Sequence, residues 1–146
     1  MLNRYRKHSK KRDAILEVLK STDTHPGAQW VYEKLKPVIP YLSLGTVYRN
    51  LNLFREEGDV VSLGVVNGEE RFDACTLPHA HVVCKVCGKV SDLSGETLAE
   101  LLENYRGFPK TSAFGKAALD LIEIHNFTID IRNTVFYGLC NDCLVK

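Results

Sequence analysis

Cysteine spacing gives the clearest chemical signal in this chain. Four of the five cysteines form two Cys-x-x-Cys pairs. Two-residue spacing lets both sulfurs of a pair bind one ion, and four thiolates in tetrahedral geometry suit a structural Zn²⁺. We predict one structural Zn²⁺ per chain, and its ligands are Cys84, Cys87, Cys140 and Cys143. A thioredoxin-like redox centre is disfavoured, because it needs one pair before a helix rather than two pairs beside strands. Cys75 lies outside the pattern and is expected to be a small buried apolar residue.

Histidines and carboxylates form a second candidate group. His79 and His81 are alternate residues of an expected strand, so both imidazoles can point to the same face. Asp73 lies upstream of them, and Asp92 lies downstream of the first cysteine pair. A mixed set of imidazole and carboxylate ligands suits Fe²⁺ or Mn²⁺, with Zn²⁺ also possible. Spacing alone does not establish that His25 and Asp73 join this group.

The first half of the chain must supply the elements that position these residues. Apolar residues recur at helical spacing in three segments, and Asn67-Gly68 is a strong hairpin signal between two strand-like runs. Pro37 and Pro40 end the second helix, and Ser43 and Gly58 are the expected N-cap and C′ residues of the third. The predicted helices are Ser9–Lys20, a segment starting at Pro26, and Leu44–Glu57, and the predicted strands are Asp59–Val66 and Glu69–Ala74.

Three short helices followed by a hairpin is the element order of a winged helix-turn-helix. In that module the third helix enters the DNA major groove, where Arg can pair with guanine and Asn with adenine. The alternative is a small helical bundle with a hairpin and no role in nucleic-acid binding. The candidate DNA-binding residues are Arg12, Ser43, Thr46, Tyr48, Arg49 and Asn50.

The second half indicates a smaller α/β domain. The expected elements are a strand from Leu77, a returning strand over Lys89–Leu93, helices over Gly95–Tyr105 and Ala117–His125, and a long strand over Phe127–Leu139. The overall fold class is therefore α+β. We expect two domains: residues 1–76 form the winged helix, and residues 77–146 form the metal-binding domain with its four-cysteine zinc site.

Composition and charge limit the class of protein. The chain has 146 residues, 45% of them hydrophobic and 25% charged, which is typical of a globular protein. No apolar run approaches the ~18 residues of a membrane span. Residues 1–12 are basic without an apolar segment, so a secretory signal is not expected and the cytoplasm is the expected compartment. Residues 1–58 contain eleven Lys or Arg against six Asp or Glu, whereas residues 59–146 contain eight against twelve. The basic half favours a polyanionic partner, although such a run is also common in solvated arms.

An ordered series of motifs resembles the ferric uptake regulator family. The motifs are Leu42–Leu51 (LSLGTVYRNL), Phe54–Gly58 (FREEG), Glu70–Asp73 (ERFD), His79–Val90 (HAHVVCKVCGKV) and Tyr137–Cys143 (YGLCNDC). The resemblance implies a homodimeric, metal-dependent repressor, with no enzymatic activity. It also implies that a winged helix binds AT-rich inverted-repeat DNA operators and that the C-terminal α/β domain forms the dimer.

Within that family the chain is most similar to the peroxide-responsive repressor branch. The resemblance implies one regulatory Fe²⁺ or Mn²⁺ per chain, and the residues at the matching positions are His25, Asp73, His79, His81 and Asp92. Other branches usually have Glu at the position of Asp92. The resemblance further implies that peroxide oxidises iron-bound His25 or His79. Many relatives have a further metal site with a histidine in the last long strand. Residues 129–133 contain no histidine, so this site is not expected.

Some segments depart from the family pattern, and two other functions stay open. Ser9–Arg12 replaces the usual Thr-Pro-Gln-Arg, and the link over Gly107–Ile124 is longer than usual. Glu123 and His125 could form an extra ligand pair, but a lone loop histidine is more often solvated. One alternative is an iron, manganese or zinc uptake regulator that ignores peroxide. The other is a small metalloenzyme, for which no obvious general base is present.

Overall fold

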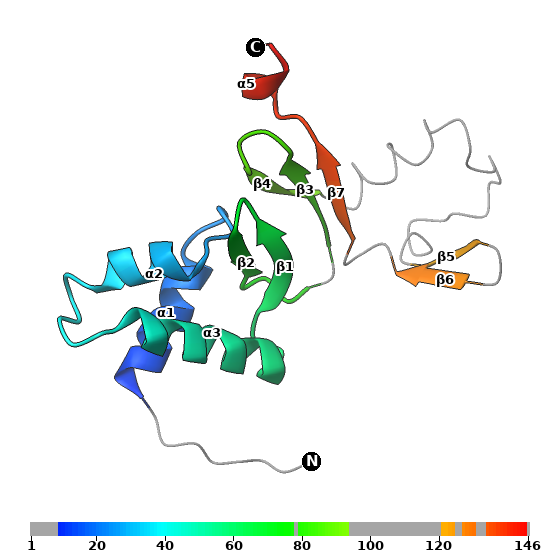
Figure 1. Cartoon of the computed structure of the whole chain (residues 1–146). Helices are drawn as coiled ribbons and strands as arrows, with labels where there is room; N and C mark the ends of the chain where they lie inside the picture. The colour runs from blue at the N-terminus through cyan, green and yellow to red at the C-terminus, as the bar shows by residue number, and fades with distance from the viewer. Residues whose placement is uncertain (1–8, 78, 94–120, 125–126, 131–133, 146) are drawn as a thin grey trace. The chain divides into compact units, whose positions relative to one another are not determined.

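The computed structural model describes residues 9–77, 79–93, 121–124, 127–130 and 134–145 of the chain. The chain divides into two compact units, residues 1–76 and residues 77–146 (Figure 1). Among the described residues, the first unit has three helices and a two-stranded sheet, and the second has strands and a short helix, which confirms the α+β class. Within the described residues, no helix has the length and apolar character needed to cross a bilayer.

The first two helices begin and end close to the predicted positions. Helix α1 spans Lys10–Lys20, and Asp13 donates its backbone N–H to the carbonyl of Ser9 at 3.0 Å. Helix α2 spans Ala28–Leu35, so it begins two residues after Pro26 and ends before Pro37. Val38 lies beyond the end of α2 and is 72% exposed.

The third helix has the predicted bounds. Helix α3 spans Leu44–Glu57, and the Ser43 hydroxyl accepts a hydrogen bond from the backbone N–H of Thr46 at 3.2 Å. Gly58 ends the helix with φ of +79°, a left-handed conformation that glycine adopts without steric cost. Val47, Leu51 and Phe54 form the apolar stripe of this helix, and all three are fully buried.

A hairpin follows α3 and closes the first unit. Strands β1 (Val61–Val66) and β2 (Glu69–Asp73) pair antiparallel, with a bulge between Ser62 and Val65. Asn67 and Gly68 both have positive φ, as a two-residue type I′ turn requires. The helices and the hairpin share one hydrophobic core, formed by Ile15, Leu19, Ala28, Val31, Leu35, Leu42, Val47, Leu51, Phe54, Val60 and Phe72.

The second unit is built around a three-stranded sheet. Its order is β4 (Val90–Leu93), β3 (Ala80–Cys84), β7 (Val135–Gly138), with β3 antiparallel to β4 and parallel to β7. Ala80, Val83 and Val90 are buried apolar residues of this sheet. A one-turn helix, α5 (Asn141–Leu144), follows β7. The pairing of β3 with β7 therefore joins segments that are more than fifty residues apart in sequence.

Two predictions for the second half are wrong. Residues 121–124 of the expected helix Ala117–His125 form strand β5 (Leu121–Ile124), paired antiparallel with β6 (Phe127–Asp130). The long strand predicted over Phe127–Leu139 is two strands in two different sheets, β6 and β7. Short apolar runs such as Leu-Ile-Glu-Ile are ambiguous between helix and strand, and pairing partners decide between them. The predicted helix Gly95–Tyr105 and the residue His125 lie outside the described residues.

Candidate metal centres

The four paired cysteines lie at the ends of β3 and β7. Cys84 is the last residue of β3, and the chain turns back so that Gly88 donates its N–H to the Cys84 carbonyl at 2.9 Å. Gly88 has φ of +72°, which suits a glycine in this tight turn. The parallel register sets Cys84 opposite Gly138, and Cys140 follows two residues later. The expectation that the last strand is tied to the first cysteine pair is thus met by the strand pairing.

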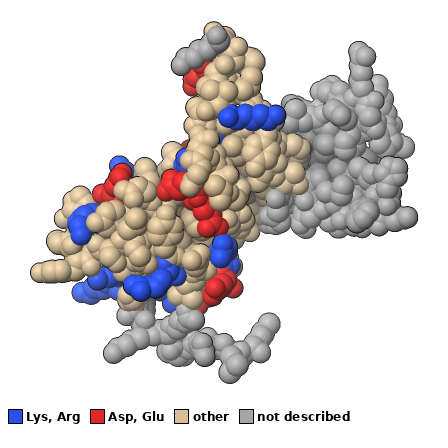
Figure 2. All heavy atoms as spheres, viewed as in Figure 1, with Lys and Arg blue, Asp and Glu red and all other residues tan. Residues whose placement is uncertain are grey.

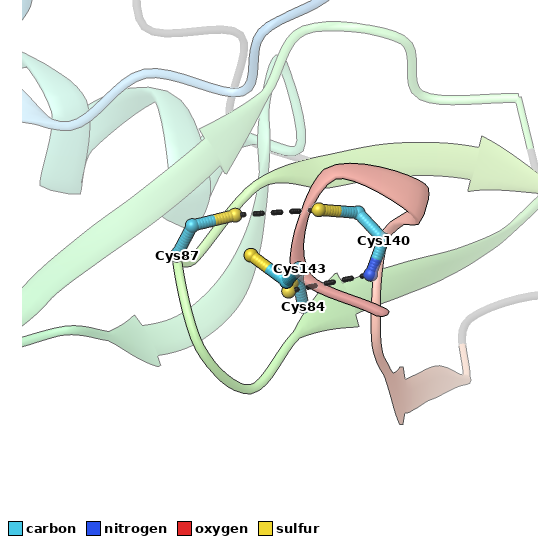
Figure 3. Close-up of side chains that lie close together, drawn as sticks. All are labelled: Cys84, Cys87, Cys140 and Cys143. Carbon is cyan, nitrogen blue, oxygen red and sulfur yellow. Dashed lines mark hydrogen bonds between the residues drawn. The ribbon is translucent and has the colours of Figure 1, made fainter. Parts of the chain in front are cut away.

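The four sulfurs form a compact cluster. All four ligand atoms lie within 4.8 Å of one another, and the Cys87 and Cys140 sulfurs are 3.6 Å apart (Figure 3). Sulfurs bonded tetrahedrally to one Zn²⁺ at ~2.3 Å are separated by roughly 3.8 Å. The backbone N–H of Cys140 donates to the Cys84 sulfur at 3.4 Å. The donor set and its spacing therefore fit a tetrahedral thiolate-bound metal.

Backbone amides make one of these thiols acidic. Hydrogen bonds from the backbone of Cys87, Cys140 and Val86 lower the pKa of the Cys84 thiol to about 6. Cys143 has the opposite shift, because the sulfur of Cys140 and burial raise its pKa to about 12. Four thiolates this close repel one another, so a bound cation is needed before all four can ionise together.

The second cysteine pair begins a helix. Cys140 is the N-cap residue of α5, and Cys143 lies within it. Both pairs lie beside strands as expected, and Cys140 and Cys143 also stand at the start of α5. An isolated redox centre still fits poorly, because these two sulfurs share one cluster with Cys84 and Cys87.

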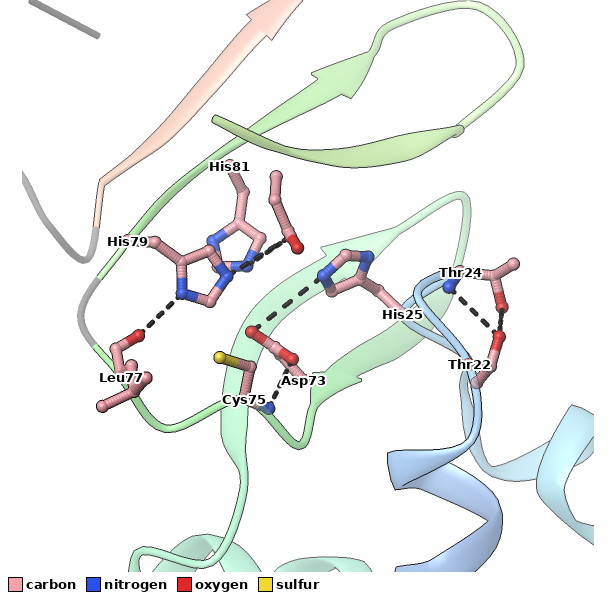
Figure 4. A network of polar contacts seen from close by, with 9 residues as sticks. Thr22, Thr24, His25, Asp73, Cys75, Leu77, His79 and His81 are labelled. Atoms are coloured by element: carbon pink, nitrogen blue, oxygen red, sulfur yellow. Dashed lines mark hydrogen bonds and ion pairs between the residues drawn. The ribbon is translucent and has the colours of Figure 1, made fainter. Parts of the chain in front are cut away.

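In the first unit, His25 and Asp73 form a buried pair. His25 is 3% exposed and Asp73 is 7% exposed. The Nε2 atom of His25 lies 4.0 Å from Oδ2 of Asp73, and Oδ1 of Asp73 accepts a hydrogen bond from the backbone N–H of Cys75 at 2.8 Å (Figure 4). An imidazole nitrogen and a carboxylate oxygen are both ligand types that suit a divalent cation such as Fe²⁺ or Mn²⁺.

In the second unit, His79, His81 and Asp92 converge. The antiparallel register sets His81 on β3 opposite Asp92 on β4. Oδ1 of Asp92 lies 3.3 Å from Nε2 of His79 and 3.5 Å from Nε2 of His81. The two ring centroids are 4.3 Å apart, and His79 immediately precedes β3. Two nitrogens and one oxygen at these distances can ligate a single divalent cation.

A backbone group that sequence analysis missed orients one of these rings. The Nδ1 atom of His79 lies 2.7 Å from the carbonyl oxygen of Leu77 (Figure 4). A proton on Nδ1 leaves Nε2 as the basic nitrogen, which is the usual arrangement of a metal-binding histidine. Every residue has a main-chain carbonyl, so the residue type at position 77 could not have indicated this contact.

Cys75 does not have its expected environment. It was predicted to be buried, but it is exposed at the end of the hairpin. Its contribution to the site is a backbone N–H bond to Asp73, which any residue except proline could supply.

The candidate DNA-binding residues lie at the start of α3 and on α1. Ser43, Tyr48 and Arg49 are exposed, whereas Thr46 and Asn50 are half-buried. Arg49 and Asn50 both bond back to Thr46, through its hydroxyl and its carbonyl respectively. Arg12 forms an ion pair with Glu57 at 2.5 Å. Figure 2 shows Lys and Arg side chains along the lower edge of this unit, where α1 and α3 lie in Figure 1.

Comparisons with known proteins agree with the motif analysis. The model of the Ferric uptake regulator family matches residues 3–111. The peroxide-responsive repressor PerR of Staphylococcus saprophyticus is 33% identical over 135 residues, which cover 92% of this chain and 80% of that protein. The structure of the Campylobacter jejuni peroxide stress regulator aligns with a TM-score of 0.60 and 29% identity over 91% of this chain and 88% of that one. The Vibrio cholerae ferric uptake regulator aligns with a TM-score of 0.58 and 28% identity over 92% of each chain.

Proposed function

The chain belongs to the ferric uptake regulator family, and on this premise we propose that it is a metal-dependent, peroxide-responsive transcriptional repressor. It binds AT-rich inverted-repeat operators as a homodimer and is not an enzyme. Residues 1–76 form its winged-helix DNA-binding domain, and residues 77–146 form its dimerisation and metal-binding domain. Its compartment is the cytoplasm, where thiols stay reduced and available to metals.

The observation that supports this proposal is the ligand chemistry of the two units. The first unit provides the buried pair of His25 and Asp73, and the second provides three convergent ligands at His79, His81 and Asp92. We propose that one Fe²⁺ or Mn²⁺ takes all five as ligands. A cation that binds only one arrangement of the units stabilises that arrangement by its differential affinity.

Metal binding then controls operator affinity through geometry. In a homodimer the two α3 helices must meet successive major grooves ~34 Å apart. Ligands drawn from both units restrict the angle between DNA-binding and dimerisation domains. The metal-free protein samples other angles and binds the operator weakly.

The structural ion is assigned to the cysteine cluster. We propose that Cys84, Cys87, Cys140 and Cys143 bind one Zn²⁺ per chain, since Zn²⁺ prefers four tetrahedral thiolates and undergoes no redox change. These cysteines hold β3, β7 and α5 together whether or not the regulatory ion is present.

Peroxide sensing is supported by the similarity to peroxide-responsive relatives and by the presence of Asp92. Fe²⁺ held by these residues would supply the redox chemistry through which hydrogen peroxide oxidises an imidazole. The ring of His25 or His79 would gain one oxygen atom of the peroxide, and the other would leave as water. The oxidised ring would be a poor ligand for the ion.

One experiment tests the core of the proposal. An AT-rich inverted repeat is titrated with the protein in a gel-shift assay, with Mn²⁺ and with chelator. We expect binding with Mn²⁺ and a loss of at least roughly tenfold with chelator. Equal operator binding with Mn²⁺ and with chelator, or no operator binding in either condition, contradicts the proposal.

A second candidate function is an iron, manganese or zinc uptake regulator. The similarity to the Vibrio cholerae ferric uptake regulator favours it. Mass spectrometry of Fe²⁺-loaded protein after peroxide separates the two. The peroxide-responsive function predicts a gain of one oxygen atom on a peptide containing His25 or His79, whereas the uptake regulator predicts unmodified peptides and metal-dependent DNA binding.

A further inference from the structure

Helix α2 begins without a capping side chain of its own. Its N-cap residue is Gly27, which has no side chain to accept a hydrogen bond. Helix N-caps are usually Ser, Thr, Asp or Asn, whose oxygen accepts from the backbone N–H of the second or third helical residue. Here the carboxylate of Glu69, on β2, accepts from the backbone N–H of Gln29 at 3.0 Å. A residue forty positions away therefore caps this helix, and its negative charge also suits the helix N-terminus.

The fit between Gly27 and Glu69 is close. A Cβ atom added to Gly27 would overlap the Cγ, Cδ and Oε1 atoms of Glu69. The backbone of Gly27 has φ of −92°, so an alanine there meets no conformational penalty of its own. The absence of a side chain at position 27 thus leaves the space that the Glu69 carboxylate fills.

The same strand restrains the residues just before α2. The backbone N–H of Phe72 donates to the carbonyl of Pro26 at 3.2 Å, and the Arg71 guanidinium lies 3.5 Å from the carbonyl oxygen of His25. His25 has φ of +51°, a left-handed conformation that a non-glycine residue keeps only when its surroundings enforce it. Strand β2 therefore holds the backbone carbonyls of His25 and Pro26, directly after the imidazole-bearing Cα, and it also provides Asp73.

We propose that Glu69 is a positioning residue for the regulatory metal ligand His25. Its carboxylate fixes the start of α2, and with Phe72 and Arg71 it holds the His25 loop in the conformation that directs the imidazole toward Asp73. This inference rests on the proposed function, in which His25 and Asp73 bind the regulatory ion. Glu69 does not bind the ion itself.

Its neighbour Glu70 offers a matched control. Glu70 is also half-buried, but its Oε1 atom bonds to Arg55 at 2.9 Å and to Ser62 at 2.6 Å. These partners belong to α3 and β1, not to the His25 loop. Both glutamates contribute polar contacts to the same unit, and only Glu69 contacts the start of α2.

The first test measures Mn²⁺ binding to the zinc-loaded full chain. We expect Glu69→Ala to weaken Mn²⁺ affinity roughly tenfold and Glu70→Ala to change it by less than about twofold. Glu69→Gln keeps an oxygen that can accept from Gln29 and is expected to stay near the wild type. Equal losses in E69A and E70A, or a loss in E69Q as large as in E69A, would overturn the positioning role.

The second test reaches the same contact from the other side, and one of its two readouts needs no regulatory metal. Gly27→Ala displaces the Glu69 carboxylate, so G27A should weaken Mn²⁺ binding about as much as E69A, and the double variant no more than either. In protein without regulatory metal, E69A should also speed hydrogen exchange of the Gln29 amide, whereas E70A should not. Additive losses in the double variant, or unchanged exchange at Gln29, would contradict the inference.

Failure of this inference is distinct from failure of the proposed function. A His25→Ala variant that binds Mn²⁺ like the wild type would contradict His25 as a ligand and would overturn both. A His25→Ala variant that loses Mn²⁺ while E69A keeps wild-type affinity would overturn the role of Glu69 alone.

Discussion

The two candidate metal centres differ in where their ligands come from. The cysteine cluster is complete within the second unit, where β3 and β7 pair directly and bring its sulfurs together. The proposed regulatory centre divides its ligands, with His25 and Asp73 in the first unit and His79, His81 and Asp92 in the second. A centre contained in one unit stabilises that unit. A centre with ligands from two units can couple their arrangement to the presence of an ion.

Ligand chemistry follows the same division. Four thiolates bind a borderline-soft, redox-inert ion with high affinity and closed coordination. Imidazoles and carboxylates suit Fe²⁺ or Mn²⁺, whose affinities for such sites are lower and allow exchange. The residue types therefore suit an ion that stays bound in the cysteine cluster and an ion that exchanges in the proposed regulatory centre.

The largest expected effect comes from breaking the cysteine cluster. Cys84→Ser removes one thiolate of the proposed zinc site, where the metal would contribute ~10 kcal/mol to folding. We expect loss of zinc, a monomeric second unit and loss of cooperative unfolding, measured by metal analysis, sedimentation and circular dichroism. Cys75→Ser is the matched control and should keep its zinc. A stable, dimeric C84S protein would contradict the structural role.

A smaller and more selective effect is expected at Asp92. Asp92→Ala removes the oxygen that faces both His79 and His81, so Mn²⁺ affinity should fall by roughly 10–100-fold. Zinc content and dimerisation should persist. Asp59→Ala, an exposed carboxylate between α3 and β1, is the control and should keep the Mn²⁺ response. If D92A lost its zinc and unfolded as C84S does, the distinction between the two centres would be wrong.

The ligands of the cysteine cluster are easier to predict from the sequence than those of the proposed regulatory centre, for a physical reason. The Cys-x-x-Cys pairs are local patterns, so their ligand chemistry is visible without a fold. The pairing of His81 with Asp92 depends on strand register, and the approach of His25 to Asp73 depends on the hairpin returning to the start of α2. The full regulatory ligand set was therefore predicted only through family resemblance; it consists of His25, Asp73, His79, His81 and Asp92.

The fold shows the same division between local and distant determinants. Helix α3 was predicted to the residue because Ser43 and Gly58 are local signals for its ends. Strands β5, β6 and β7 were mispredicted because their identities depend on pairing partners elsewhere in the chain. The exposure of Cys75 and Val38 likewise depends on where neighbouring elements end.

An intermediate effect is expected at the recognition helix. Arg49 is exposed on α3, and a bidentate contact between an arginine and guanine contributes ~1–3 kcal/mol. Arg49→Ala should lower operator affinity by that amount and relax the sequence preference, as measured by fluorescence anisotropy on operator variants. Lys20→Ala, at the far end of α1, should leave the sequence preference unchanged. An unaltered preference in R49A would exclude Arg49 from base contacts.

The smallest expected effect concerns Arg12. Its guanidinium pairs with Glu57 and lies 5.5 Å from the centre of the Phe54 ring. Partly exposed ion pairs contribute little, so Arg12→Ala should cost at most ~1 kcal/mol of stability in the first unit. Chemical denaturation measures this cost, and the salt dependence of operator binding shows whether Arg12 also contacts phosphate. If operator affinity of R12A depended on salt concentration as strongly as that of the wild type, Arg12 would not be a DNA-binding residue.

The parallel pairing of β3 with β7 has a consequence for how this chain tolerates change. In this pairing Cys84 lies opposite Gly138, so the two ends of the chain segment between the cysteine pairs are held next to each other. The entropy lost on closing a flexible loop grows only with the logarithm of its length, about 0.6 kcal/mol for each doubling. A change of length in that connection outside β4, β5 and β6 should therefore add little to the entropy of closing it, while the pairing of β3 with β7 keeps the two cysteine pairs together.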